Sequence, residues 1–260
     1  MTALDTGFCW TELSTADLAR SARFYRSVFG WECVERKMHV SYGRALDYSL
    51  FMLGQRNVAG LHAQIGAQRQ QGARPAWLSY ILVSEVDPLA ARAVLLGGKL
   101  LAPPLDVADL GRLAILSDPQ GARLGLWQGL RLGAGFQVRG EPGCAAWFEH
   151  VSGDPAAAAR FYSELTGVPV RRAGPSDDRR WVLGAAAPLA GFSPDSQPSP
   201  LPPQWVVCFQ VDDGQAACEK VVRANGTILM APRGEDPQVA LVRDSAGASF
   251  GLLCPRRGGA

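Results

Sequence analysis

One long internal repeat limits what this chain of 260 residues can fold into. Six residues of the first half recur in the second half in the same order, each 137 positions later and without a gap. Because six spaced identities at one separation do not arise easily by chance, the two halves are expected to share one fold. The pairs are Trp10 and Trp147, Glu12 and Glu149, Asp17 and Asp154, Phe24 and Phe161, Tyr25 and Tyr162, and Gly30 and Gly167.

The repeat continues downstream and divides the chain into two parts. Trp77 matches Trp205, and the turn that begins at Asp118 matches the turn that begins at Asp244. Between the halves, residues 129–143 carry several glycines and show no hydrophobic periodicity, which is typical of a linker. We therefore predict a first domain over residues 1–130, a linker over 131–142 and a second domain over 143–260.

Each half begins with an apolar strand that leads into a helix. In the first half, Asp17 is placed to cap the helix, because its side chain can accept a hydrogen bond from a free N–H group of the first turn. An apolar stripe starts at Leu18, and Gly30 ends the helix. A second helix follows another apolar strand in each half, at about 87–96 and 213–225. Strands and helices mixed in this order predict an α+β fold.

Each half also opens and closes on a similar stretch of sequence. The opening stretches are WTELSTADLARSARFYRSVFGW and WFEHVSGDPAAAARFYSELTGV, and the closing stretches are SDPQGARLGLWQ and RDSAGASFGLLC. With these motifs, residues 8–254 resemble the vicinal oxygen chelate superfamily, which includes glyoxalases, extradiol dioxygenases, epimerases and bleomycin-type resistance proteins. The resemblance implies four βαβββ modules that form two tandem domains of the glyoxalase/bleomycin-resistance kind, each with a sheet curled around a cleft.

In the metal-dependent members of that superfamily, a few strand positions in each domain hold the metal. The resemblance places at these positions residues that cannot coordinate a cation: an indole, a glycine or an aliphatic side chain. A divalent ion needs several nitrogen, oxygen or sulfur donors. We therefore predict no metal and no cofactor in either half. The positions are Trp10, Gly60, Leu78 and Gly125 in the first half and Trp147, Gly191, Val206 and Gly251 in the second.

Aromatic residues are concentrated where the resemblance places the two clefts. Side chains alternate between the faces of a strand, so the residues that share the face of a metal-ligand position are expected to point into the cleft. Ordinary core packing is the alternative for the tryptophans, because large aromatic side chains dominate buried cores. The predicted ligand-binding residues are Trp10, Glu12, Trp77, Tyr80, Trp127, Trp147, Glu149 and Trp205.

Glu12 and Glu149 are the candidate catalytic residues, because a carboxylate that faces a partly apolar cleft can act as a general base. The alternative is a structural ion pair with an arginine such as Arg112, Arg123 or Arg243.

Three classes of function fit these residues. The leading hypothesis is metal-independent binding of a small aromatic or amphipathic molecule, similar to the resistance and sequestration members of the superfamily. The alternative is an enzyme on the same scaffold: a metal-free lyase, isomerase or hydrolase that uses Glu12 or Glu149, or an oxygenase whose metal site lies elsewhere in the alignment. The third is a scaffold with filled clefts that binds a protein partner.

Composition excludes some other classes. There are 26 Lys and Arg against 24 Asp and Glu, with no basic run long enough to follow a phosphate backbone, so nucleic acid is not expected as a partner. The N-terminus shows no secretory signal, and no segment approaches the roughly 20 apolar residues of a membrane span. Six cysteines without a CxxC spacing favour buried, reduced thiols. We expect a cytoplasmic monomer or homodimer.

Overall fold

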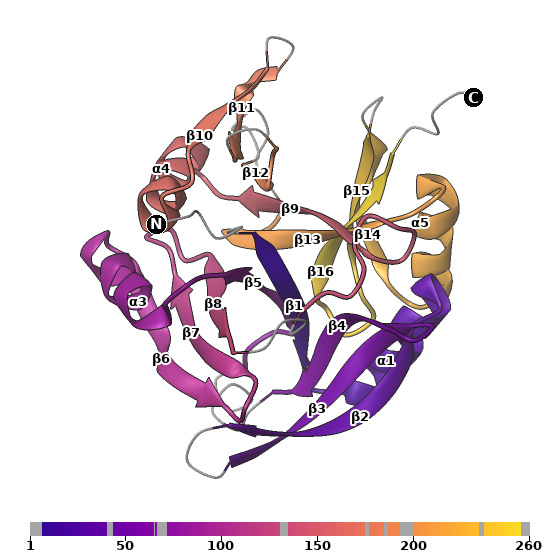
Figure 1. Cartoon of the computed structure of the whole chain (residues 1–260). Helices are drawn as coiled ribbons and strands as arrows, with labels where there is room; N and C mark the ends of the chain where they lie inside the picture. Colours follow the sequence, from indigo (N-terminus) through magenta and orange to yellow (C-terminus); the bar gives the residue numbers. More distant parts are fainter. Residues whose placement is uncertain are drawn as a thin grey trace.

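The computed structural model of the protein contains two groups of strands that follow one another along the chain (Figure 1). Residues 131–134 of the predicted linker lie outside the part of the chain that the structure describes, and the predicted domain boundaries stay a prediction. The described residues are 7–40, 44–64, 66, 72–130, 135–174, 177–184, 187–192, 200–233 and 237–255.

The first half consists of two βαβββ modules. In chain order the elements are β1 (Phe8–Thr15), α1 (Leu18–Phe29), β2 (Glu32–Val40), β3 (Arg44–Leu53), β4 (Arg56–Ala63), β5 (Ala76–Leu82), α3 (Val86–Leu95), β6 (Lys99–Val107), β7 (Gly111–Ser117) and β8 (Arg123–Gly129). The eight strands close into a barrel in the order β1-β4-β3-β2-β6-β7-β8-β5. The first strands of the two modules, β1 and β5, run antiparallel at the seam, and β2 and β6 complete the ring through Val40 and Val107.

The second half repeats the same two modules. Its elements are β9 (Ala145–Val151), α4 (Pro155–Thr166), β10 (Val170–Gly174), β11 (Asp177–Leu183), β12 (Ala190–Phe192), β13 (Gln204–Gln210), α5 (Gly214–Arg223), β14 (Thr227–Arg233), β15 (Gln238–Arg243) and β16 (Ser249–Cys254). Over the described residues these strands form an eight-stranded sheet in the order β10-β11-β12-β9-β13-β16-β15-β14, with β10 and β14 at its ends. The predicted α+β fold of four βαβββ modules is confirmed.

The predicted capping residues set the limits of the first helix in each half. The Asp17 carboxylate accepts a hydrogen bond from the backbone N–H of Arg20 at 2.9 Å, and Asp154 caps α4 in the same way. Gly30 and Gly167 end these helices with φ of 74° and 73°, a left-handed conformation that glycine adopts without a steric cost. Helices α3 and α5 lie within two residues of their predicted ranges.

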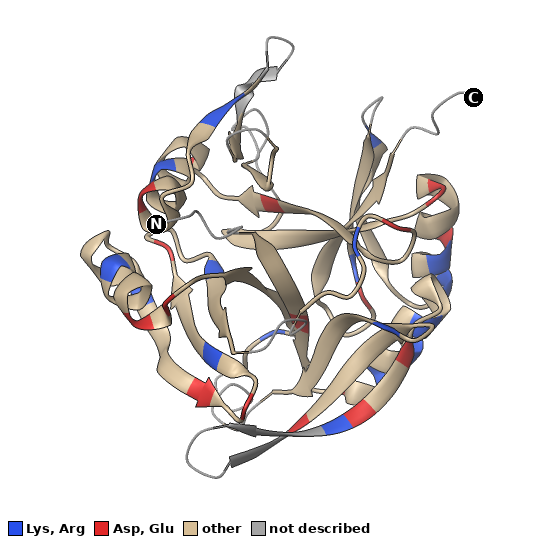
Figure 2. Ribbon diagram, viewed as in Figure 1, with Lys and Arg blue, Asp and Glu red and all other residues tan. Residues whose placement is uncertain are grey.

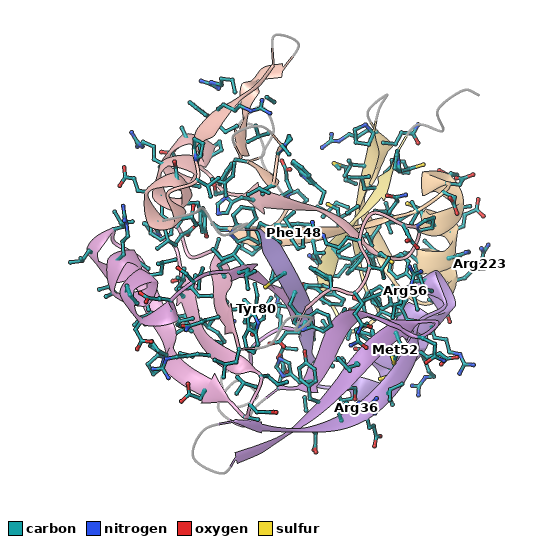
Figure 3. The ribbon with its side chains drawn as sticks, in the orientation of Figure 1. Arg36, Met52, Arg56, Tyr80, Phe148 and Arg223 are labelled. Carbon is teal, nitrogen blue, oxygen red and sulfur yellow. The ribbon has the colours of Figure 1, made fainter. Side chains whose placement is uncertain are left out.

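One apolar core runs through both halves. Phe8 of β1 stacks on Phe148 of β9 with ring centroids 4.0 Å apart, and Figure 3 places Phe148 at the centre of the molecule. Helix α1 of the first half packs beside α5 of the second. Charged residues lie mainly on the helices and outer strands (Figure 2). Because the two sheets share a core, the halves are expected to unfold together.

Two buried aspartates join the halves. The hydroxyl of Tyr25 on α1 donates to Asp244 of the second half at 3.0 Å. In return, the hydroxyl of Tyr162 on α4 donates to Asp118 of the first half at 3.2 Å. Asp118 also lies 2.8 Å from Nε2 of His150, whose side chain is fully buried. Each half therefore supplies a tyrosine to the other half's closing turn.

No helix in the described part of the chain is long and apolar enough to cross a membrane.

Candidate functional site

A network of hydrogen bonds centred on Glu12 occupies the inside of the barrel. The hydroxyl of Tyr80 donates to Glu12 Oε1 at 2.6 Å, and the hydroxyl of Tyr48 donates to Oε2 at 3.1 Å. Nε1 of Trp10 donates in turn to the Tyr48 hydroxyl at 2.8 Å. Nε2 of His62 lies 3.6 Å from Glu12 Oε1. Figure 3 shows Tyr80 within the ring of strands. The barrel thus brings together side chains from β1, β3, β4 and β5.

Strand register explains why this network fits. Glu12 lies opposite Gly60 on β4 and opposite Leu78 on β5, while Tyr80 lies opposite Gly125 on β8. A Cβ atom at Gly60 would overlap the Tyr48 hydroxyl, and one at Gly125 would overlap the Tyr80 ring. The glycines that stand at predicted metal-ligand positions therefore make room for two tyrosines.

The electrostatics of the network hold the tyrosines in their protonated form. Burial, and then the nearby Glu12 carboxylate, raise the pKa values of Tyr48 and Tyr80 well above the ordinary range. At neutral pH both hydroxyls therefore donate, and each occupies one oxygen of Glu12. A carboxylate that is bound in this way is a poor general base, because it must give up a hydrogen bond before it can accept a proton from a ligand.

The expectation that Glu12 forms a structural ion pair with an arginine was wrong. Among the described residues, Glu12 pairs with tyrosines and His62 instead. Arg112 points to the outer side of the barrel, where it binds Asp87 of α3 and Asp106 of β6 at 2.7 Å each. Strand alternation accounts for this, since the outward face of β7 meets α3 rather than the barrel interior.

The second half places an indole and a carboxylate at the corresponding positions of β9. Nε1 of Trp147 donates to Glu149 Oε2 at 2.6 Å, and both side chains are half-buried. Glu149 lies opposite Gly191 and Val206, as Glu12 lies opposite Gly60 and Leu78 in the barrel. The same register is therefore used twice.

The residue that corresponds to Tyr80 is small in the second half. Cys208 stands there, opposite Trp147 on one side and Gly251 on the other. Around it lies an apolar cluster that is separate from the main core and against which Trp147 packs. The other members are Val151, Leu201, Val206 and Leu241, with Leu229, Met230 and Leu253 partly buried at its border.

Two predicted ligand-binding tryptophans lie on the opposite face of their strands. Trp77 and Trp205 are 8% and 3% exposed and belong to the main core. Nε1 of Trp77 donates to the Tyr25 hydroxyl at 2.9 Å. Trp127 does lie on the Gly125 face of β8, half-buried over Gly111. Of the predicted residues, Trp10, Glu12, Tyr80 and Trp127 therefore lie on the face of the metal-ligand positions in the first half. Trp147 and Glu149 lie on that face in the second half.

Sequence reasoning missed Tyr48 and His62. Both lie in the β3–β4 hairpin, and Tyr48 stands directly opposite His62 there. Neither residue carries a local motif, because its place beside Glu12 depends on how β1 pairs with β4. A glycine at a strand position where an interior side chain is expected was the available signal, since it indicates that something else fills the space.

The donor set does not fit a metal of the kind that the superfamily uses. Within the described residues, no group of three or more His, Cys, Asp or Glu side chains could hold an ion. His62 and Glu12 are neighbours, but the remaining places around them are taken by phenols and an indole. We therefore derive no chemistry through a metal at this site.

Comparison with known proteins agrees with this architecture. Residues 7–126 match the family model of the glyoxalase/bleomycin resistance protein/dioxygenase superfamily, and residues 148–253 match a glyoxalase-like domain. The chain therefore belongs to the glyoxalase/bleomycin resistance protein/dioxygenase superfamily, with two domains in tandem.

Relatives of similar length share both domains. A Mycobacterium tuberculosis protein named "Putative glyoxylase CFP32" is 31% identical over 95% of this chain and 94% of its own length. The anthracycline biosynthesis protein DnrV of Streptomyces peucetius is 31% identical over 96% and 93%.

Solved structures show the same fold at lower identity. The Mn(II)-bound glyoxalase of Novosphingobium aromaticivorans has a TM-score of 0.64 at 16% identity, covering 96% of this chain and 82% of that one. The 2,3-dioxygenase LapB of Pseudomonas sp. KL28 has a TM-score of 0.60 at 12% identity, covering 99% and 94%.

Proposed function

We propose that the protein binds a planar aromatic or amphipathic small molecule without a metal, and that the site lies in the second half. The observation that carries the proposal is the pair of Trp147 and Glu149 beside an apolar cluster. An indole offers a flat apolar surface for stacking, and a neighbouring carboxylate orients a polar edge of the ligand. Such a surface binds small molecules by burial and stacking rather than by coordination.

The first half is the weaker candidate because its interior is already occupied. Tyr48 and Tyr80 fill the spaces over Gly60 and Gly125, and they hold both oxygens of Glu12. A ligand would have to displace hydrogen-bonded phenols there. In the second half, Cys208 stands in place of Tyr80 and leaves its neighbourhood apolar.

The names of the relatives support a small-molecule ligand. One is named "Putative glyoxylase CFP32", and another is named for the biosynthesis of anthracyclines, which are compounds with fused aromatic rings. A flat ring system of that chemical class matches the shape that an indole face recognises.

Calorimetric titration of the protein with a neutral dihydroxyanthraquinone measures the binding affinity and tests the proposal. Trp147→Ala is expected to weaken binding about tenfold or more, because a lost stacking ring costs about 1.4 kcal/mol. Trp10→Ala is the matched control in the other half and should leave affinity nearly unchanged. Glu149→Gln should have a smaller effect than Trp147→Ala. Equal losses in Trp10→Ala and Trp147→Ala, or no loss in either, would overturn the assignment.

The enzymatic alternative makes a different prediction for the same titration. If Glu149 acts as a general base, the ligand is converted on prolonged incubation, and Glu149→Gln abolishes conversion while affinity stays nearly intact. Recovery of the unchanged compound, measured by chromatography, supports the binding function.

A further inference from the structure

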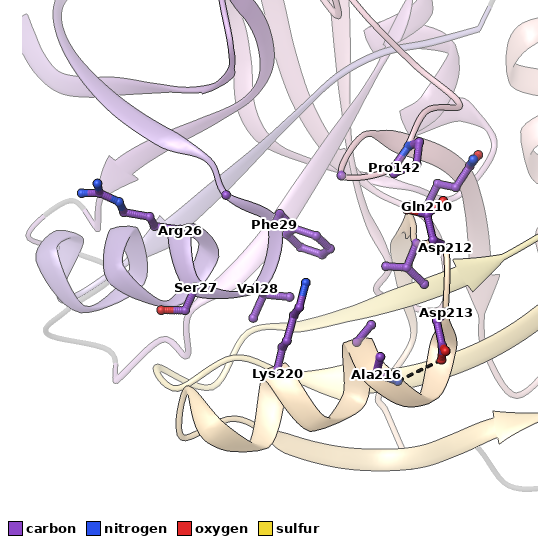
Figure 4. Close-up of a pocket in the computed structure, with 14 residues that line it drawn as sticks. Arg26, Ser27, Val28, Phe29, Pro142, Gln210, Asp212, Asp213, Ala216 and Lys220 are labelled. Carbon is purple, nitrogen blue, oxygen red and sulfur yellow. Dashed lines mark hydrogen bonds between the residues drawn. The ribbon is translucent and has the colours of Figure 1, made fainter.

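A cavity that lies outside both sets of predicted site residues is found where the two halves meet. It has a volume of about 530 Å³ and is formed by the end of α1, the segment Pro142–Gly143, the end of β13 and the start of α5 (Figure 4). This volume is within the usual range for small-molecule sites. None of the residues discussed above as candidate ligand-binding or catalytic groups lines it.

The floor of this cavity is apolar and rigidly supported. Val28, Val211 and Ala217 are buried beneath it. The ring of Phe29 forms one wall and stacks on Trp31 with centroids 4.9 Å apart. Nε1 of Trp31 donates to the carbonyl of Gly143 at 2.8 Å, which ties the linker side of the cavity to this wall. The cavity therefore does not depend on the ligand for its shape.

The charges around the cavity are not equivalent. Figure 4 shows the ammonium group of Lys220 directed toward the Phe29 ring, whereas Arg26 points away. Asp213 is engaged in capping α5, since its carboxylate accepts from the N–H of Ala216 at 2.9 Å. Asp212 also lines the rim. In the part of the chain that the structure describes, Lys220 forms no ion pair, so its charge is available to a ligand.

We propose that this cavity binds a small organic monocarboxylate with an aromatic or branched aliphatic body. The apolar body would cover Val28 and Phe29, and the carboxylate would meet the ammonium group of Lys220, which lies in the last turn of α5. The ammonium group of Lys220 favours an anion over a neutral ligand of the same shape, and the ring of Phe29 offers an apolar surface to the body of the ligand. This proposal is independent of the function assigned to Trp147.

Calorimetric titration of the full-length protein with 2-naphthoate, compared with the neutral 2-naphthamide, tests it. Naphthoate is expected to bind and naphthamide to bind at least about tenfold more weakly, as loss of one charge-assisted contact implies. Lys220→Gln should remove this preference, and Lys220→Arg should keep it. Arg223→Gln is the matched control, because Arg223 lies on the same helix but pairs with Glu219 outside the cavity. Equal affinity for the two compounds, or no effect of Lys220→Gln, would overturn the proposal.

A second variant tests the position of the ligand. Ala216→Trp places a large side chain in the lining and should abolish naphthoate binding, while Gln215→Trp, one residue earlier and not in the lining, should leave it intact. Circular dichroism confirms that each variant is folded. Binding that survives Ala216→Trp but is lost in Trp147→Ala would place naphthoate in the second-half site and refute this cavity. Lys220→Gln should leave anthraquinone binding unchanged, which separates the two proposals.

Discussion

The two halves of this protein share one repeated sequence pattern, but different side chains fill the space beside the positions at which the superfamily holds its metal. In the first half, tyrosines fill the space over Gly60 and Gly125, and their hydroxyls hold Glu12 in a closed barrel. In the second half, Cys208 replaces the tyrosine, and an apolar cluster surrounds the indole and carboxylate of β9. The corresponding space therefore holds a polar hydrogen-bond network in the first half and a candidate binding surface in the second half.

The closing turns of the two halves differ as well. Asp118 and Asp244 each bind a tyrosine of the other half, but Asp118 also binds His150, where the first half has Leu13. Burial alone would raise the pKa of Asp118, but the hydrogen bond and charge of His150, together with backbone N–H groups, outweigh it and lower that pKa. Among the described residues, no histidine faces Asp244 in the same way, and burial raises the pKa of Asp244 despite its hydrogen bonds.

The largest effect is expected from removing the charge of Asp118. Asp118→Asn should lower the free energy of unfolding by about 3 kcal/mol or more, because it takes away the carboxylate that the fully buried His150 ring contacts. Asp244→Asn should cost about 1 kcal/mol, since an amide oxygen can still accept from the backbone N–H groups of the turn. Urea unfolding measures both. Equal costs would show that His150 contributes nothing to the difference between the turns.

Next in size is the effect of filling the glycine spaces. Gly125→Ala should destabilise the protein by about 3 kcal/mol, because the new Cβ overlaps the Tyr80 ring, which Glu12 holds in place. Gly251→Ala should cost about 1 kcal/mol, since Cys208 is a smaller neighbour. Thermal unfolding measures the two variants. In a Tyr80→Ala background the cost of Gly125→Ala should shrink, and a constant cost would contradict the packing argument.

A third prediction concerns pH. Because the pKa of Asp118 is lowered in the folded state, its contribution is present above the ordinary value of 3.8 and is lost as pH falls through the folded pKa. The raised pKa of Asp244 has the opposite sign: its contribution is present below 3.8 and is lost as pH rises through the folded pKa. The stability differences between wild type and Asp118→Asn or Asp244→Asn, measured by urea unfolding from pH 3 to 7, should therefore slope in opposite directions.

The smallest effect is expected from chelation. EDTA should change neither the melting temperature nor anthraquinone binding, because the described residues offer no group of donors for a metal in either half. Elemental analysis of the purified protein should find no stoichiometric transition metal. One tightly held zinc, iron, nickel or manganese ion per half, retained through dialysis, would contradict this prediction.

Much of the fold was predictable because it depends on local rules. The repeat, the capping aspartates and the ending glycines all act within a few residues, and Asp17 and Gly30 stand where the sequence places them. The faces of Trp77 and Trp205 were not predictable in this way. Strand alternation gives two faces, but both faces of these strands carry mainly apolar side chains, so hydrophobicity does not show which face meets the core.

The network around Glu12 lay beyond sequence reasoning for a different reason. Tyr48 reaches Glu12 only because β3 pairs with β4 and β4 pairs with β1 in one particular register. A shift of one residue would turn Tyr48 to the other side of the sheet. Such a contact is a property of the assembled barrel rather than of any segment.

The exchange of tyrosines between the halves also bears on the ancestry of the chain. Tyr25 donates to Asp244, and Tyr162 donates to Asp118. Each half therefore supplies one tyrosine and one aspartate to the same kind of contact, as identical subunits do across a two-fold axis. A half-length ancestor that paired with its own copy would make both contacts from a single gene. After fusion of two such genes, the two copies of the sequence could change independently of each other. Under that history, Leu13 and His150 record a divergence that became possible only after the two copies were covalently joined.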